Sequence, residues 1–307
     1  MELTSYATAR RWQVDNPSPS GATIEIAGWD FGGEGPLALL HHANGMCAAT
    51  WGLVARALTR DYRVVAIDAR GHGDSAHLSV PEDYSWEYFV SDLSQVARQL
   101  LAETGESSVA LGLGSSFGGI VTAGTEAAHS GLYQRVVMLD PPIHPTADLV
   151  EALGLTMVAE PGSRREQLVA QTLRRRSVWS SRDEARNAWA DKPLFAPWHG
   201  AAFDLYINEG MGDQPNGSVA LKCPPEVEAH IFQTTGSLGV LDYAPRVDVP
   251  VLLVHAATGF FPEEFFRLIT TLFPQGEFAQ IDGGHMLPLE VPDLVVARLR
   301  EWIGLAD

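Results

Sequence analysis

Short apolar runs alternate along this chain with segments of helical periodicity, and this alternation limits the folds that the chain can adopt. Continuous apolar runs indicate strands buried on both faces. They occur at residues 36–42, 62–68, 107–113, 135–140 and 250–256, after an alternating early run at 22–29, and a further strand is expected within 277–285. Amphipathic patterns lie between them, the longest over 85–105 with Gly105 at a C-cap position. The chain therefore predicts an α/β fold, with a mainly parallel sheet flanked by helices.

The pattern changes between Pro141 and about Thr235. Helical segments at 164–176 and 181–190 are separated by loop-like pieces such as 210–219, and no buried-strand run appears. We predict a mostly helical cap or lid over residues 143–235, inserted into a core formed by residues 1–142 and 236–307.

Charge narrows the range of partners. The chain of 307 residues carries a formal net charge of −17 at pH 7. Nucleic acids and anionic membrane surfaces would be repelled unless a basic patch offset this charge. The one basic cluster, Arg174 to Arg176, is interpreted as a solvated helix face paired with neighbouring acids. We therefore expect a small-molecule substrate, with no nucleic-acid partner and no membrane.

Location and metal content are predicted from what the chain does not contain. No apolar run approaches the roughly 18 residues of a membrane span, and the first 20 residues lack the apolar region of a signal peptide. Cys47 and Cys223 lie far apart and form no ligand pattern. These features favour a cytoplasmic protein with two reduced thiols and no metal.

The stretch "VALGLGSSFGGIV" (109–121) can be interpreted in two ways. As a dinucleotide loop, it would follow the first strand of its domain and precede an acidic residue by about 20 positions. Here several strands come first, and no acid ends a strand at that distance. As a nucleophile elbow, it places Gly114 and Gly118 two residues before and after Ser116, where a strand and a helix must approach closely. Ser115 lacks this spacing, so we predict Ser116 as a nucleophile and no cofactor.

With segments on both sides of the elbow included, the chain resembles the α/β-hydrolase family over nearly its whole length. Four segments match the family in order: "LLHHANG", "DARGHGDS", "GSSFGG" and "GGHMLPLEVPDLV". The first resembles the oxyanion-loop motif, with Ala43 where glycine is usual. The resemblance implies an α/β-hydrolase fold with nucleophile, acid and histidine in that order along the chain.

The resemblance assigns the catalytic base to His285, which follows the last strand. His41, His42 and His72 are interpreted as structural residues that shape the nearby loops. Serine needs such a base within hydrogen-bond distance, and the base needs an acid to orient it.

The position of the acid departs from the commonest family pattern. That pattern places it after the penultimate strand, where this chain has Gly259, with Glu263 and Glu264 a few residues later. Some members place the acid one strand earlier, where Asp140 ends the run 135–140. We predict Asp140, with Glu263 or Glu264 as the alternatives.

The family builds its oxyanion hole from two backbone amides. By resemblance these belong to Phe117 and Asn44, with Gly45 or Met46 as alternatives if the early loop is shifted. The Asn44 side chain is a further candidate donor.

The predicted function is hydrolysis of an ester or lactone of a medium-sized apolar or aromatic small molecule, through an acyl-enzyme. The pocket is expected to include Met46, His144, Trp179 and Trp198. Carbon–carbon bond hydrolysis and peracid formation use the same three catalytic residues and stay open, as does a catalytically silent binding protein.

Overall fold

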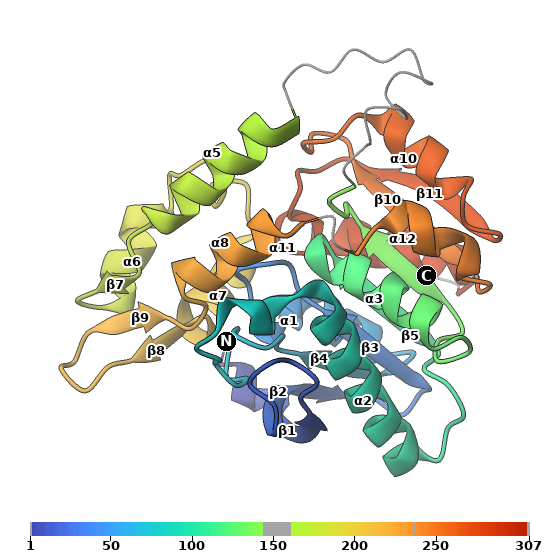
Figure 1. The fold of residues 1–307 in the computed structure, drawn as a ribbon, viewed down its shortest axis with the longest axis horizontal. Helices are drawn as coiled ribbons and strands as arrows, with labels where there is room; N and C mark the ends of the chain where they lie inside the picture. Colours follow the sequence, from blue (N-terminus) through green and yellow to red (C-terminus); the bar gives the residue numbers. More distant parts are fainter. Residues whose placement is uncertain (1, 144–160, 236–237, 306–307) are drawn as a thin grey trace.

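An eight-stranded sheet forms the centre of the computed structural model, which describes residues 2–143, 161–235 and 238–305 (Figure 1). The strand order is β1-β2-β4-β3-β5-β6-β10-β11. Only the β1–β2 and β2–β4 pairs are antiparallel, so the sheet is mainly parallel, as predicted. The strands are β1 (Thr8–Asp15), β2 (Thr23–Gly32), β3 (Leu37–His41), β4 (Arg63–Ile67), β5 (Leu111–Ser115), β6 (Val136–Leu139), β10 (Val251–Ala256) and β11 (Gly276–Ile281).

Helices cover both faces of this sheet. The apolar cluster on one face includes side chains from α2 (Trp86–Thr104), α3 (Phe117–Ala128) and α10 (Glu263–Thr270). The cluster on the other face includes side chains from α1 (Gly52–Leu58) and α12 (Pro292–Trp302). Strand β3 supplies both, because successive side chains of a strand point to opposite faces. This double burial explains the continuous apolar runs of the sequence.

The edge strand β1 was not predicted from the sequence. Its alternation is carried by two inward residues, Trp12 and Val14, among polar neighbours that face solvent. Two apolar residues are too few to separate such an edge strand from a polar loop.

Residues 161–233, between β6 and β10 and here called the insert, lie to one side of the sheet (Figure 1). The insert contains α5 (Pro161–Leu173), α6 (Arg182–Trp189), α7 (Gly200–Glu209) and α8 (Pro225–Gln233). It also contains a small antiparallel sheet of β7 (Val178–Trp179), β9 (Val219–Leu221) and β8 (Met211–Asp213). The segment expected to be a loop is thus mostly a hairpin, which Gly217 turns at a φ of 83°.

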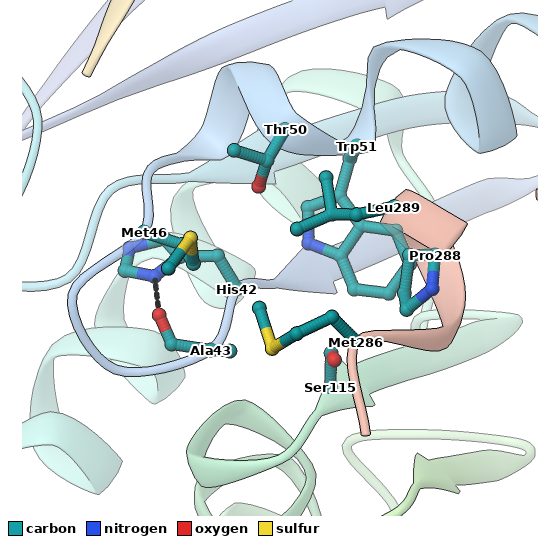
Figure 2. A pocket seen from close by; sticks show the side chains of 9 residues that line it. All are labelled: His42, Ala43, Met46, Thr50, Trp51, Ser115, Met286, Pro288 and Leu289. Atoms are coloured by element: carbon teal, nitrogen blue, oxygen red, sulfur yellow. Dashed lines mark hydrogen bonds between the residues drawn. The ribbon is translucent and has the colours of Figure 1, made fainter. Parts of the chain in front are cut away.

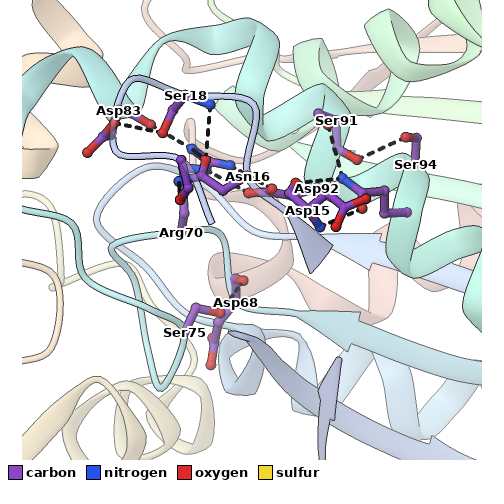
Figure 3. Close-up of polar contacts among 12 residues, drawn as sticks. Asp15, Asn16, Ser18, Asp68, Arg70, Ser75, Asp83, Ser91, Asp92 and Ser94 are labelled. Carbon is purple, nitrogen blue, oxygen red and sulfur yellow. Dashed lines mark hydrogen bonds and ion pairs between the residues drawn. The ribbon is translucent and has the colours of Figure 1, made fainter. Parts of the chain in front are cut away.

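The loop after β4 is anchored by a buried arginine (Figure 3). Arg70 donates two hydrogen bonds of 2.7 Å to the Asp92 carboxylate on α2, and a third of 2.8 Å to the Asp83 carbonyl. Asn16 accepts a fourth at 3.1 Å. These contacts join the loop to α2 and to the segment after β1.

None of the helices within the described ranges is long and apolar enough to cross a membrane.

Candidate functional site

Ser116 occupies the sharp turn between β5 and α3. Its φ of 52° and ψ of −120° lie outside the regions that L-residues normally adopt. A Cβ on Gly114 would lie 2.2 Å from the Gly118 carbonyl oxygen, and one on Gly118 would lie 2.2 Å from the His41 carbonyl oxygen. The glycine spacing therefore follows from the close approach of strand and helix.

Two hydrogen bonds connect Ser116, His285 and Asp140. Asp140 Oδ2 accepts from His285 Nδ1 at 2.6 Å, and His285 Nε2 accepts from Ser116 Oγ at 2.9 Å. A proton on Nδ1 leaves Nε2 unprotonated and able to receive the serine proton. Asp140 is fully buried, while the His285 side chain is 16% exposed. The three residues come from the ends of β5 and β6 and from the loop after β11.

Asp140 is fixed in place on several sides. Its Oδ1 accepts the Ala256 amide at 3.0 Å, and its own amide donates to the Val254 carbonyl at 2.8 Å. Its φ of 43° is unusual for a residue with a side chain. A Cβ on Gly259 would lie 2.9 Å from Asp140 Oδ2. The glycine at the commoner acid position thus leaves room for the Asp140 carboxylate.

The other carboxylates considered for this role lie elsewhere. Glu263 accepts from Arg267 at 2.6 Å and from Gln280 at 2.9 Å, and Glu264 is exposed at the start of α10. The carboxylate that accepts the hydrogen bond from His285 Nδ1 is that of Asp140.

Sequence reasoning missed Glu290, which holds the loop that carries His285. This residue ends α11 (Leu287–Glu290), and its carboxylate accepts the Gly284 amide at 2.7 Å and the Met286 amide at 3.0 Å. The two amides flank His285, so Glu290 fixes the backbone on both sides of the imidazole. The sequence signal for this role was a carboxylate five residues after His285, in a segment whose two glycines directly precede the histidine.

The oxyanion loop (residues 43–47) leaves one of its candidate amides open. The Gly45 amide donates to His72 Nε2 at 3.0 Å, and the Met46 amide donates to the Ala43 carbonyl at 3.0 Å. Both alternatives are therefore occupied. Within the described ranges, the backbone amides of Asn44 and Phe117 make no hydrogen bond. Phe117 begins α3, where helix amides lack intrahelical acceptors.

Side chains of the two predicted oxyanion residues are engaged away from the open amides. Asn44 Nδ2 donates to the Glu228 carbonyl at 3.0 Å, so this side chain is not a free donor. The Phe117 ring packs edge-on against Trp86 and Phe89 in the core.

Buried neutral histidines shape the oxyanion loop. His42 Nδ1 donates to the Ala43 carbonyl at 2.8 Å, while its Nε2 accepts the Ala69 amide at 2.9 Å. Burial lowers the pKa of His42 to about 3 and that of His41 to about 4, and it lowers the pKa of His72 as well. These imidazoles stay neutral, which keeps their acceptor nitrogens available. Among the described residues, no three His, Cys, Asp or Glu side chains are grouped to hold a metal ion.

A small pocket lies between the oxyanion loop and the segment after His285 (Figure 2). Its lining includes Ser115 and Met286, the chain neighbours of Ser116 and His285. Neither the Ser115 hydroxyl nor the Trp51 indole N–H has a hydrogen-bond partner there. The lining residues are His42, Ala43, Met46, Thr50, Trp51, Ser115, Met286, Pro288 and Leu289.

Of the four predicted pocket residues, Met46 lines this pocket. Trp179 and Trp198 do not, because they pack into the aromatic cluster at the centre of the insert. Trp179 contacts Trp189 at a ring-centroid distance of 4.7 Å, and Trp198 contacts Phe195 at 4.8 Å. His144 lies outside the described residues.

Comparison with known proteins identifies relatives of this chain. Residues 38–298 match the model of the alpha/beta hydrolase family. A pimeloyl-[acyl-carrier protein] methyl ester esterase from Vibrio atlanticus is 35% identical over 109 residues, which span 36% of this chain and 38% of that protein. Protein phosphatase methylesterase 1 from Yarrowia lipolytica is 32% identical over 34% of this chain and 29% of its own length. Each match thus spans less than two fifths of the relative.

Solved structures share the fold over nearly the whole chain. An E-2-(acetamidomethylene)succinate hydrolase has a TM-score of 0.74 at 17% identity, and the match covers 97% of this chain and all of that one. A thermophilic esterase from Thermogutta terrifontis has a TM-score of 0.67 at 20% identity, with 96% and 98% coverage. At such identities the likeness concerns the fold alone.

Proposed function

Because this chain belongs to the alpha/beta hydrolase family, we propose that it is a serine hydrolase that cleaves an ester or lactone of an apolar small molecule. The observation that carries the proposal is the pair of hydrogen bonds from Ser116 to His285 and from His285 to Asp140. The esterase names of the two sequence relatives support the choice of an ester bond.

The first half of the reaction forms the acyl-enzyme. His285 Nε2 takes the Ser116 proton as Oγ attacks the substrate carbonyl carbon, and Asp140 stabilises the resulting imidazolium. The carbonyl oxygen, now negative, accepts hydrogen bonds from the Asn44 and Phe117 amides. His285 then returns its proton to the departing alkoxide, which leaves as the alcohol.

The second half releases the acid. Water loses a proton to His285 Nε2 as it attacks the acyl carbonyl, and the same two amides hold the oxyanion. Collapse breaks the bond to Ser116 Oγ, which recovers its proton from His285. One ester and one water thus give one acid and one alcohol, with no cofactor.

The pocket residues favour an apolar group beside the scissile bond. Met46, Met286 and Leu289 supply thioether and aliphatic surface next to the serine-bearing turn. The insert is proposed to act as a cap, with its aromatic cluster packed behind this surface. Since Trp179 and Trp198 belong to that cluster, they no longer argue for an aromatic substrate.

A fluorophosphonate probe tests the proposal most directly, with mass mapping of the labelled peptide. We expect stoichiometric labelling at Ser116 that is lost in Ser116→Ala. Asp140→Asn should slow both labelling and ester turnover by about 10⁴-fold, as is typical when the acid of such a site becomes an amide.

The rival activities give different results in the same experiment. An unlabelled wild-type protein would contradict the hydrolase proposal and favour a silent binding protein. Labelling without hydrolysis in a panel of methyl, aryl and lactone substrates would favour carbon–carbon bond hydrolysis or peracid formation, which product analysis separates.

A further inference from the structure

We propose that Tyr206 and the Arg175–Glu228 ion pair of the insert are positioning residues, which hold the oxyanion loop so that the Asn44 amide faces the reacting carbonyl. The inference rests on the proposed function, because it assigns the insert a role in the same site. Two hydrogen bonds, one close packing contact and one partly buried charge pair support it.

The two hydrogen bonds cross from the insert to the oxyanion loop. The Tyr206 hydroxyl, on α7, donates to the Gly45 carbonyl at 3.2 Å. Asn44 Nδ2 donates to the carbonyl of Glu228, on α8, at 3.0 Å. Tyr206, Asn44 and Glu228 are all buried, so little water competes for these bonds. The carbonyl and side-chain atoms of the loop are thus held by the insert, while its Asn44 amide is left open.

Gly45 makes the packing contact. Its φ of 77° favours glycine, and a Cβ there would lie 2.8 Å from the Glu228 carboxyl carbon and Oε1. The Glu228 carboxylate therefore lies directly against the oxyanion loop, and a shift of α8 would move the loop with it.

Charge explains why Arg175 belongs to this group. A buried carboxylate so close to the oxyanion loop would oppose the negative charge that develops on the substrate oxygen. Arg175, just after α5, forms an ion pair with Glu228 and neutralises it. The pair also ties the end of α5 to α8, so that two insert helices act on the loop together.

Tyr206→Phe tests the hydrogen bond, and Tyr243→Phe is its matched control. Tyr243, which ends α9 (Val240–Tyr243), is equally buried, and its hydroxyl donates to the Ile120 carbonyl at 3.3 Å, away from the oxyanion loop. Removing one such bond from Tyr206 should lower kcat about tenfold with KM unchanged. Amide hydrogen exchange in the peptide that covers residues 43–51 should quicken. The control should change neither.

Arg175→Met tests the charge. This variant leaves the Glu228 carboxylate unpaired, so we expect kcat to fall by at least tenfold. Adding Glu228→Gln removes the unpaired charge while keeping the carbonyl that Asn44 uses, and kcat should recover most of the loss.

The outcomes separate this inference from the proposed function. In an active wild-type enzyme, an unchanged kcat in Tyr206→Phe, or no recovery in the double variant, would overturn the positioning role. If the wild-type protein hydrolyses no ester, the proposed function fails, and exchange in the 43–51 peptide decides the inference by itself. Equal exchange in Tyr206→Phe and Tyr243→Phe would then overturn it.

Discussion

The sheet core and the insert each contain an arginine–carboxylate ion pair, and the two pairs are built differently. In the core, Arg70 and Asp92 are 0% and 3% exposed, and the guanidinium makes further hydrogen bonds to Asp83 and Asn16 (Figure 3). In the insert, Arg175 and Glu228 are 21% and 8% exposed, and Arg175 Nε has no partner among the described residues.

This difference indicates different roles. A charge pair whose hydrogen bonds are all made holds a structure together, because removing one partner leaves a buried charge unsolvated. A pair with unmet hydrogen-bonding capacity contributes less to stability. The second pair lies against the oxyanion loop, so we expect the first to act on stability and the second on turnover.

Breaking the core pair should give the largest effect on stability. Arg70→Met leaves Asp92 unpaired, and the free energy of unfolding should fall by about 3–5 kcal/mol. Turnover per folded molecule should be unchanged. Urea unfolding with active-site titration measures both. The comparison fails if Arg175→Met loses as much stability as Arg70→Met, or if Arg70→Met slows turnover in the folded fraction.

Lowering the pH should change the stability contributions of a core carboxylate and an insert carboxylate in opposite directions. Burial raises the pKa of Asp68, in the core, to about 6. Below pH 6 the carboxyl of Asp68 is therefore protonated in the folded state, whereas in the unfolded chain it stays ionised until the pH falls to its ordinary pKa of about 4. As the pH falls from 6 to 4, the free energy of unfolding of the wild-type protein should therefore rise by about 1.4 kcal/mol per pH unit relative to that of Asp68→Asn.

Asp213, in the insert, provides the control for this pH dependence. The hydrogen bond and charge of Arg182 lower the pKa of Asp213. A lowered carboxyl pKa stabilises the fold at high pH, and that stabilisation is lost as the pH falls through the folded value. Melting temperatures of Asp213→Asn should shift with pH in the opposite sense to those of Asp68→Asn. If the melting temperatures of both variants shifted in the same sense with pH, the opposite pKa shifts assigned to Asp68 and Asp213 would be contradicted.

Adding one methyl group at Gly259 should disturb the core site. Its Cβ would lie 2.9 Å from Asp140 Oδ2, and overpacking of this kind costs about 1–3 kcal/mol. Gly259→Ala should therefore lower kcat by displacing the carboxylate from His285. Gly200→Ala, at the start of α7 in the insert, meets no atom within 4 Å and should leave kcat unchanged. Equal kcat values in the two variants would count against Asp140 as the acid.

Ser115→Ala should have the smallest effect. Among the described residues its buried hydroxyl has no hydrogen-bond partner, so removing it should change the unfolding free energy by less than about 1 kcal/mol. Ester turnover should stay near that of the wild-type protein, whereas Ser116→Ala should abolish it. A loss of turnover in Ser115→Ala would place the pocket hydroxyl in the reaction.

Features with a local cause were predictable from the sequence. Strands buried on both faces need continuous apolar runs, and the elbow needs glycine two residues before and after Ser116. His285, placed behind two glycines after the last strand, lies within hydrogen-bond distance of Ser116 as the family resemblance implied. Edge strand β1 escaped prediction because few of its residues are apolar, and the β8–β9 hairpin escaped it because each of its strands has only three residues.

Only the tertiary structure decided which distant groups meet. The acid that contacts His285 stands 145 residues away, and the carbonyl that receives Asn44 Nδ2 stands 184 residues away. Local sequence favoured Asp140 but left Glu263 and Glu264 as alternatives, and it offered aromatic residues that could serve as lining or as core. Backbone propensity and steric limits act over a few residues, so the sequence by itself determined the buried strands, the long helices and the elbow. A hydrogen bond between distant side chains depends on how those elements pack, and packing alone decided the partners of His285 and of the oxyanion loop.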